Sequence, residues 1–106
     1  MTQNIRGNIE FDEQQVADFC RTWKVIELSL FGSVLRDDFR PDSDVDVLVV
    51  FAPDAPWSYW DWGSMTEQLE AIFCRRVDLV EKRSLVNPYR RHRILTTRRI
   101  IHRHAA

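Results

Sequence analysis

Three aspartates stand in or beside segments with the composition of β-strands. Asp44 and Asp46 are two residues apart, where the apolar run 45–51 begins. Because side chains alternate along a strand, both carboxylates are expected on the same face of a sheet. Asp78 interrupts a second apolar run at 77–80, and a carboxylate there is costly to bury unless it is paired or bound to a metal.

If these two strands are neighbours, the three carboxylates converge. Like charges held close together repel one another and raise one another's pKa, and divalent cations relieve that repulsion. Carboxylate oxygens are hard ligands that suit Mg²⁺. The pattern therefore predicts catalytic, metal-binding aspartates at 44, 46 and 78. Two ions roughly 4 Å apart would serve an in-line phosphoryl transfer.

A candidate phosphate-binding turn lies upstream of these aspartates. Gly32 and Ser33 follow the β-rich run 25–30, and Gly allows a phosphate to approach the backbone closely. The Ser hydroxyl and the free N–H groups of a following turn bind phosphate oxygens. Arg36 adds a guanidinium to the same place, so Gly32, Ser33 and Arg36 are the predicted nucleotide-binding residues.

Each motif taken alone is weak. An isolated Asp-x-Asp is most often a turn or a surface feature. An EF-hand loop beginning at Asp42 would need Gly at position 47 and Glu at position 53, where this chain has Val47 and Pro53. A glycosyltransferase Asp-x-Asp would need a sugar-nucleotide domain that 106 residues do not accommodate. The joint spacing of Gly-Ser, Asp-x-Asp and a third strand Asp is far more specific.

The elements that must position these residues follow from periodicity and caps. We expect helices at 12–23, 58–73 and 87–97, a helical turn at 34–38, and strands at 25–30, 45–51, 77–80 and 99–104. Gly63 weakens the second helix, which could instead start near Ser64. The 30–45 connection is too short for a crossover helix, so the strands that it joins should be antiparallel neighbours. The predicted fold class is α/β (α+β), a small mixed sheet flanked by helices.

Composition sets further limits. The chain has 106 residues, 44% hydrophobic and 29% charged, which excludes a disordered or fibrous protein. The start has no apolar signal region, and the longest apolar run, 47–52, is far shorter than the ~20 residues of a membrane span. Cys20 and Cys74 are isolated and are expected to be small buried residues. A reduced, cytoplasmic protein with no membrane partner is predicted.

The charge is divided unequally along the chain. Residues 1–81 carry a net charge of −9, and residues 82–106 carry +8 with no acid. This basic end could contact nucleic-acid phosphates or an acidic partner. Only Tyr89 could stack on a base, so nucleic acid is disfavoured as a partner. The favoured interpretation is a solvated arginine face on an amphipathic helix with Ile94 and Leu95 inward.

Four aromatic residues crowd one short segment before and within the predicted second helix: Trp57, Tyr59, Trp60 and Trp62. They cannot all face one side of a helix. Such residues are most often core or partly exposed caps. The sharper hypothesis is a protein interface, because Trp and Tyr dominate binding hot spots.

The segments 31–33, 40–46, 76–80 and 84–85 together resemble the polymerase-β-like nucleotidyltransferase superfamily. They are most similar to the minimal nucleotidyltransferases, the antitoxin half of HEPN/MNT toxin–antitoxin pairs. The resemblance runs from about 26 to 102, so residues 1–106 are expected to form a single minimal nucleotidyltransferase domain. It departs at Asp37, where relatives usually carry Gly, which leaves the shape of the turn after Arg36 open.

The resemblance implies that Asp44 and Asp46 ligate two Mg²⁺ ions, and that Asp78 ligates the catalytic ion and helps deprotonate the acceptor. Gly32 and Ser33 would hold the triphosphate of ATP. The implied reaction transfers AMP from ATP to a tyrosine hydroxyl of a partner HEPN-type toxin, which is silenced. Two alternatives stay open: a non-catalytic antitoxin that masks the toxin by binding it, and nucleotidyl transfer to a small molecule.

Overall fold

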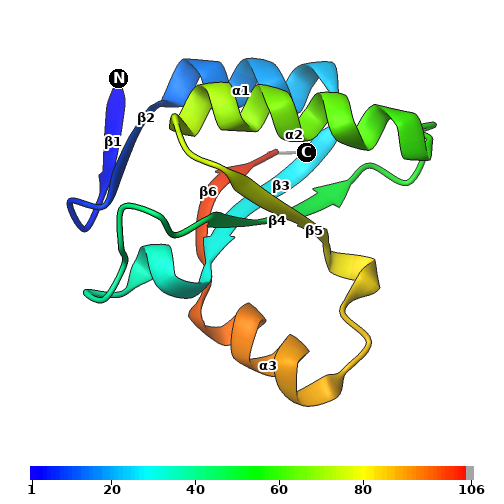
Figure 1. The fold of residues 1–106 in the computed structure, drawn as a ribbon. Coiled ribbons are helices and arrows are strands. Elements are labelled where there is room, and N and C mark those ends of the chain that lie inside the picture. The colour runs from blue at the N-terminus through cyan, green and yellow to red at the C-terminus, as the bar shows by residue number, and fades with distance from the viewer. Residues whose placement is uncertain (105–106) are drawn as a thin grey trace.

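The computed structural model describes residues 1–104 of the chain (Figure 1). Three α-helices, two short 3₁₀ turns and six strands follow one another along it. The elements are β1 (Thr2–Ile5), β2 (Ile9–Asp12), α1 (Glu13–Thr22), β3 (Val25–Phe31), η1 (Gly32–Leu35), β4 (Val45–Phe51), α2 (Tyr59–Phe73), β5 (Val77–Glu81), η2 (Lys82–Ser84), α3 (Pro88–Thr97) and β6 (Arg99–Arg103).

The main sheet has four strands in the order β5-β4-β3-β6. β3 is antiparallel to both β4 and β6, whereas β4 and β5 are parallel. The sheet is therefore mixed, as predicted, and the strands joined by the short 30–45 connection are antiparallel neighbours. β4 lies inside the sheet, which explains its nearly continuous apolar sequence.

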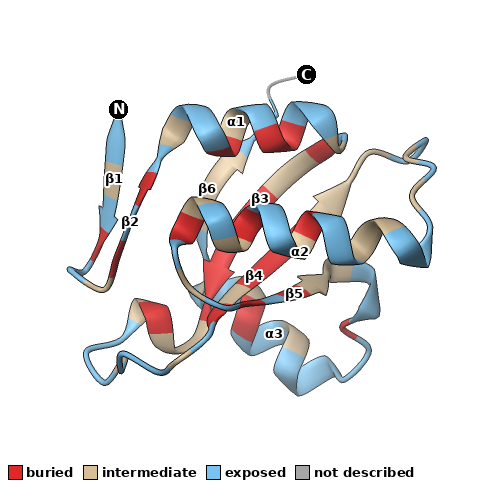
Figure 2. Cartoon of the chain, turned by 45° about the horizontal axis from the view of Figure 1, so that its top comes forward, coloured by how far each residue is buried: buried red, intermediate tan, exposed pale blue. Residues whose placement is uncertain are grey.

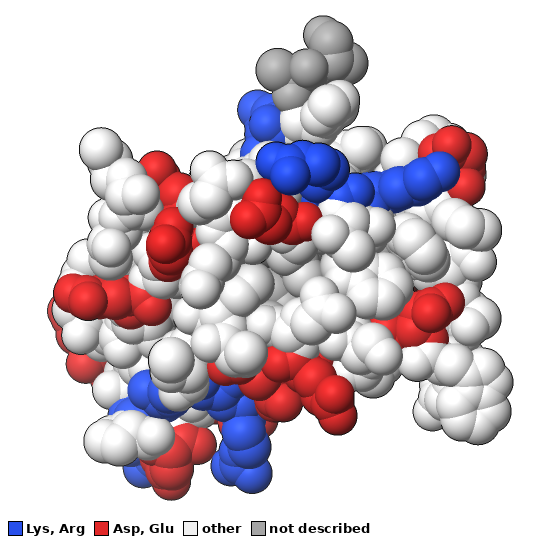
Figure 3. All heavy atoms as spheres, turned by 90° about the horizontal axis from the view of Figure 1, so that it is seen from above, with Lys and Arg blue, Asp and Glu red and all other residues white. Residues whose placement is uncertain are grey.

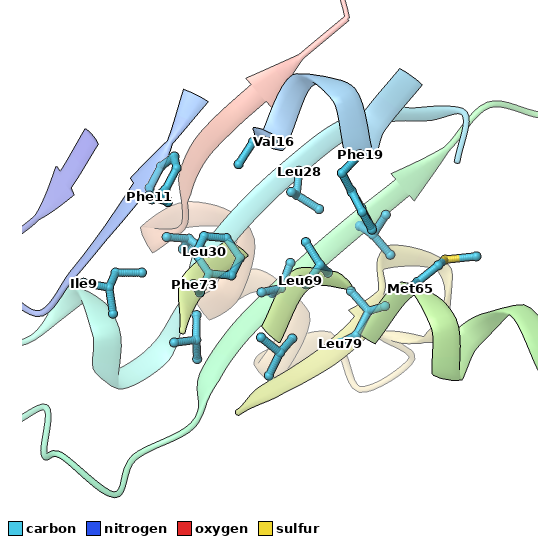
Figure 4. Close-up of a cluster of buried hydrophobic side chains, with 14 of the residues drawn as sticks. Ile9, Phe11, Val16, Phe19, Leu28, Leu30, Met65, Leu69, Phe73 and Leu79 are labelled. Carbon is cyan, nitrogen blue, oxygen red and sulfur yellow. The ribbon is translucent and has the colours of Figure 1, made fainter. Parts of the chain in front are cut away.

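Helices α1 and α2 lie side by side on one face of this sheet, and α3 lies on the other (Figure 1). The larger core is on the α1/α2 side, where Leu28, Leu69 and Phe73 are buried among other apolar side chains (Figure 4). The buried positions of α1 and α2 follow the 3.6-residue period of a helix, so each helix turns one apolar side toward the sheet. On the other face, α3 covers a much smaller buried cluster of Phe31, Leu48, Leu85 and Ile94.

The difference between the two faces is visible in the exposure of the helices (Figure 2). Helix α3 is mostly exposed and buries only Ile94 completely, with Leu95 partly buried beside the small cluster. Both residues point inward, as the amphipathic interpretation of the basic segment predicted. The helix starts with Pro88 at its N-terminus, and the Asn87 side chain accepts hydrogen bonds from the N–H groups of Tyr89 and Arg90.

An N-terminal hairpin is the main element that the sequence patterns did not reveal. β1 and β2 pair antiparallel, and Ile5, Ile9 and Phe11 enter the larger core. The ring of Phe11 meets that of Phe73 edge to face, with centroids 5.4 Å apart. These strands are only four residues long, so two alternating positions in each carried too little signal.

The predicted helix boundaries are confirmed with two corrections. Helix α2 begins at Tyr59, because Ser58 and Asp61 form a capping box, so the later start near Ser64 was wrong. The turn predicted at 34–38 is a 3₁₀ turn that spans Gly32–Leu35. It therefore contains the Gly-Ser pair instead of following it.

The two cysteines differ in exposure. Cys20 is buried in α1, and burial raises the pKa of its thiol to about 12. Cys74 is exposed, which contradicts the prediction for it, because it ends α2 in the left-handed conformation with a φ of 56°. Within residues 1–104, no helix has the length and apolar character needed to cross a bilayer.

Candidate active site

The parallel register of β4 and β5 places Asp46 directly opposite Asp78. Neighbouring strands lie about 4.8 Å apart, so the two backbones hold these carboxylates side by side. Asp44 precedes β4 and lies two residues from Asp46. Val45 and Val47 point to the α1/α2 core, so the alternating carboxylates belong to the face that α3 partly covers. The two strands are neighbours, as the prediction required; the convergence of all three carboxylates on a metal stays a prediction.

The surroundings of Asp46 disfavour its negative charge. Its pKa is raised, first by burial and then by the nearby charges of Asp78 and Asp44. The guanidinium groups of Arg90 and Arg36 act in the opposite direction without cancelling the effect. A cation placed among these carboxylates would remove the repulsion that raises the pKa.

Asp78 is exposed, which corrects the expectation of a carboxylate within a buried strand. Its neighbours Val77 and Leu79 face the larger core and are buried, as the apolar pattern predicted. β5 is an edge strand, and its α3-side face is uncovered at this position. Asp78 thus keeps most of its hydration and is reachable from solvent, which suits a group that must meet ligands.

Asp44 is held by a different partner. Its carboxylate forms an ion pair with Arg76 at 3.4 Å; the Arg76 side chain is largely exposed and that of Asp44 is half exposed. Among the residues that the structure describes, no three His, Cys, Asp or Glu side chains form a compact ligand cluster ready for a metal ion. The donor set nevertheless fits Mg²⁺ chemically, because all three groups are carboxylates and one of them is destabilised by its neighbours.

Position 32 requires glycine, because the Asp46 side chain lies directly beside its backbone. It has a φ of 76°, a conformation that L-residues with a side chain rarely adopt. A Cβ built on it would overlap Oδ2 of Asp46 and lie 3.3 Å from the Cγ atom of the same side chain. A glycine is therefore needed here for two reasons: the backbone angle and the space that the carboxylate occupies.

The N-terminal hairpin supports the turn that contains Gly32. The side-chain amide of Asn8 donates hydrogen bonds to the backbone carbonyls of Val34 and Arg36, each at 2.9 Å. Arg6, in the same hairpin turn, pairs with Asp37. Among residues 1–104, positive φ angles occur at Arg6, Gly7, Lys24, Gly32 and Cys74, so Asp37 needs no glycine-like backbone.

The loop that leads to Asp44 is held by Arg75, the second residue after the end of α2. The guanidinium of Arg75 donates to the carbonyls of Arg40 and Ser43 at 2.7 and 2.6 Å. It also stacks over the ring of Phe39, 4.5 Å from the centroid. The loop before Asp44 is therefore connected to the end of α2, the helix that covers the opposite face of the sheet.

A cleft of about 490 Å³ lies between the η1 turn and α3. Gly32 and Arg36 line one side, and Arg90 and Arg93 line the other. No acidic side chain is among its described lining residues, which include the apolar Phe31, Leu35 and Ile94. Arg36 also pairs with Asp38 at 3.1 Å, and this contact lowers the pKa of Asp38.

Arg90 and Arg93 were missed as site residues by the sequence interpretation, which treated the arginines of α3 as a solvated face. A spacing of three residues places them on one side of the helix together with Ile94 and Thr97. The sequence therefore contained the signal that they share a face. Only the packing of α3 shows that this face borders the turn at Gly32.

The fold is that of a nucleotidyltransferase domain. Residues 13–101 match the family model described as the nucleotidyltransferase domain, and the chain belongs to that family.

Among its relatives is the protein adenylyltransferase MntA of Thermococcus cleftensis, which is 46% identical over 61 residues. That alignment covers 58% of this chain and 60% of the relative's length, so the chain spans less than two thirds of it.

Solved structures share the architecture. One described as a candidate minimal nucleotidyltransferase superposes with a TM-score of 0.66 and 31% identity, covering 81% of this chain and 85% of that chain. A toxin–antitoxin structure with AMP-PNP gives a TM-score of 0.68 over 88% of this chain and 74% of that one. Its identity of 21% limits that likeness to the fold.

Proposed function

We propose that this chain is an Mg²⁺-dependent nucleotidyltransferase that moves AMP from ATP to a tyrosine hydroxyl of a HEPN-type toxin and thereby acts as its antitoxin. The observation that carries the proposal is the register of Asp46 with Asp78 beside Gly32. Support for a protein acceptor comes from the relative named protein adenylyltransferase, and support for a toxin partner comes from the toxin–antitoxin structures with this fold.

In the proposed reaction, Gly32 and Ser33 receive the triphosphate at the start of the η1 turn, where residue 32 has no side chain of its own and the Asp46 carboxylate lies beside its backbone. Arg36, Arg90 and Arg93 line the adjoining cleft and neutralise phosphate charge from both sides. The apolar lining at Leu35 and Ile94 offers a surface for the uncharged part of the nucleotide.

Asp44, Asp46 and Asp78 are the proposed ligands of two Mg²⁺ ions. When bound, the ions supply charge neutralisation for the attacking and leaving oxygens. Asp44 must exchange its contact with Arg76 for this role. Asp46 gains most from the binding of a cation, because its negative charge is already disfavoured by burial and by the two other carboxylates.

Asp78 is the proposed acceptor of the proton. The hydroxyl oxygen of the acceptor attacks the α-phosphorus, the bond from that phosphorus to the α–β bridging oxygen breaks, and pyrophosphate leaves. The proton of the hydroxyl passes to the carboxylate of Asp78. Its exposure at the edge strand gives a hydroxyl on a second protein access to this position.

Incubation with ATP labelled on the α-phosphate, Mg²⁺ and the partner toxin tests the proposal. We expect label on the toxin, loss of transfer by at least roughly a thousandfold in the D44N/D46N variant, and no transfer without Mg²⁺. The matched control is D42N, which removes a neighbouring exposed carboxylate that pairs with Arg40 at 3.8 Å. Equal labelling by the D44N/D46N variant would overturn the assignment.

The same variants separate catalysis from masking. If the D44N/D46N variant protects cells from the toxin as well as the natural chain does, the protein works by covering the toxin, and the catalytic proposal is wrong. The cytoplasmic location and the single domain over 1–106 stay predictions.

A further inference from the structure

The four aromatic residues at the start of α2 divide into two structural pairs. Trp57 donates from Nε1 to the carbonyl of Trp23 at 2.6 Å and packs edge to face on its ring. Trp62 packs on Phe51 in the same manner. These two tryptophans therefore serve the fold, and the interface hypothesis for Trp57 is not supported by its position.

Tyr59 and Trp60 behave differently. They are 88% and 85% exposed, although both lie in the first turn of an ordered helix. Their rings contact each other edge to face, with centroids 6.2 Å apart. Large aromatic side chains left almost fully in water contribute little to folding, and Trp and Tyr are the residues most enriched in binding hot spots.

The charged residues within α2 itself are all acidic, while Arg83, which pairs with Glu81, borders the start of the helix beside Ser58 and Trp62. No Lys or Arg occurs between positions 41 and 74, a stretch that contains all of α2. Glu67 lies seven residues after Trp60, on the same exposed side of the helix. Figure 3 looks down on α1 and α2 and shows separate acidic patches on largely uncharged surface, with the basic side chains gathered at the upper edge and the lower left.

The helix also contains a glycine for which the described residues offer no packing reason. Gly63 is exposed, and a Cβ built on it would meet nothing within 4 Å. Glycine inside a helix is less favourable than alanine. Gly63 lies one turn from Trp60 on the same side of the helix. Because it has no side chain, the surface beside the two aromatic rings has no protruding group at this position.

This surface is remote from the proposed active site. Asp46 and Asp78 are near the starts of the parallel strands β4 and β5, whereas α2 begins beyond the far end of β4. A strand of seven residues is about 20 Å long. Binding at Tyr59 and Trp60 therefore leaves the carboxylates and the cleft at α3 open.

We infer that the exposed face of α2 around Tyr59, Trp60 and Glu67 is a docking surface for a partner protein that presents a basic amphipathic helix. Apolar side chains of that helix cover the two rings, and its Lys or Arg side chains meet the acidic surface and the faces of the rings. The docked partner is held away from the carboxylates, so this face provides affinity without taking part in chemistry.

The test uses a labelled amphipathic peptide of Leu and Lys, about four helical turns long, and a charge-reversed peptide of Leu and Glu, with binding followed by fluorescence anisotropy. We expect the Lys peptide to bind at least roughly tenfold more tightly than the Glu peptide. The Y59S/W60S variant should lose at least roughly tenfold in affinity for the Lys peptide. The matched control is V86S/Y89S, which removes the other exposed apolar pair from a basic region.

Equal losses in the two double variants, or equal binding of the two peptides, would overturn the inference. Sedimentation of the peptide-free chain gives a further outcome. A dimer that Y59S/W60S dissociates would make a second copy the occupant and contradict the proposed partner. The D46N variant should bind the Lys peptide as the natural chain does, so failure of the transfer proposal and failure of this one are distinguishable.

Discussion

The two faces of the four-stranded sheet are built for different purposes. On one face, α1, α2 and the N-terminal hairpin bury a continuous apolar core. On the other, α3 covers a small cluster and leaves the carboxylates beside an open cleft. Strand β4 belongs to both faces, since Val45, Val47 and Val49 enter the large core while Asp46 points the other way.

This contrast explains why the three aspartates lie on the half-covered face. A carboxylate that must keep its charge and bind ligands cannot be placed in a sealed apolar layer, because desolvation would favour its neutral form. The half-covered face gives Asp46 an intermediate position: buried enough for its pKa to rise, yet open to Asp78 and to solvent. We therefore expect stability to depend on one face and ligand binding on the other.

The largest effect on stability should come from the sealed face. Leu69 is fully buried there, and L69A should lower the free energy of unfolding by about 3 kcal/mol through lost burial and a cavity. Urea denaturation measures the change. I94A, on the cleft side, should cost less because the space that it leaves opens to the cleft. Equal losses would show that the two faces are not distinct.

Gly32 should give the next largest effect. G32A must force a left-handed residue and displace the Asp46 carboxylate, and we expect about 2 kcal/mol of destabilisation together with loss of Mg²⁺-dependent stabilisation. Gly7 is the matched control, because it has the same φ of 76° but open space where a Cβ would stand. G7A should cost less and leave the Mg²⁺ response intact. Identical behaviour of the two variants would contradict the steric role assigned to Gly32.

Substitution of Asn8 should have a smaller effect on stability and should also weaken ATP binding, because this residue connects the N-terminal hairpin to the η1 turn. N8A removes two hydrogen bonds to the carbonyls of Val34 and Arg36, which should cost about 1 kcal/mol and weaken ATP binding by loosening the η1 turn. Thermal unfolding with and without ATP measures both parts. N8D keeps the size but loses the donor, so it should be no better than N8A. Full ATP affinity in either variant would show that the turn is held without the hairpin.

The smallest expected change concerns the charge of Asp46. Because its pKa is raised in the folded state, the folded chain binds this proton more tightly than the unfolded chain does, and stability falls as pH rises through the raised pKa. D46N removes that loss. Without Mg²⁺ it should be more stable than the natural chain by about half a kcal/mol at neutral pH, a small gain because the group is partly solvated.

At a pH below the usual range of an aspartate, this advantage of D46N should vanish. With Mg²⁺ present the order should reverse, since only the natural carboxylate gains the cation. Unfolding curves at several pH values, with and without Mg²⁺, provide the measurement. If the difference in unfolding free energy between D46N and the natural chain were the same at every pH, the electrostatic account of this face would be contradicted.

Much of this arrangement could be predicted from sequence because the signals are local. The helical spacing of Val16, Phe19 and Cys20 marks the buried side of α1, and all three are buried. The short 30–45 connection required antiparallel β3 and β4. The spacing of Gly32, Asp44 and Asp46 placed a Gly-Ser turn and two carboxylates at the ends of adjacent strands.

Local sequence patterns were enough to specify the helices, the alternation in β4 and the residue types of the candidate site, because side-chain period and caps act within a few residues. The exposure of Asp78, the position of Arg90 and Arg93 at the cleft and the support of the η1 turn by a hairpin became visible only in the folded chain. Those features depend on which surfaces pack together. The energy of that packing comes from residues far apart in the chain, which no local pattern encodes.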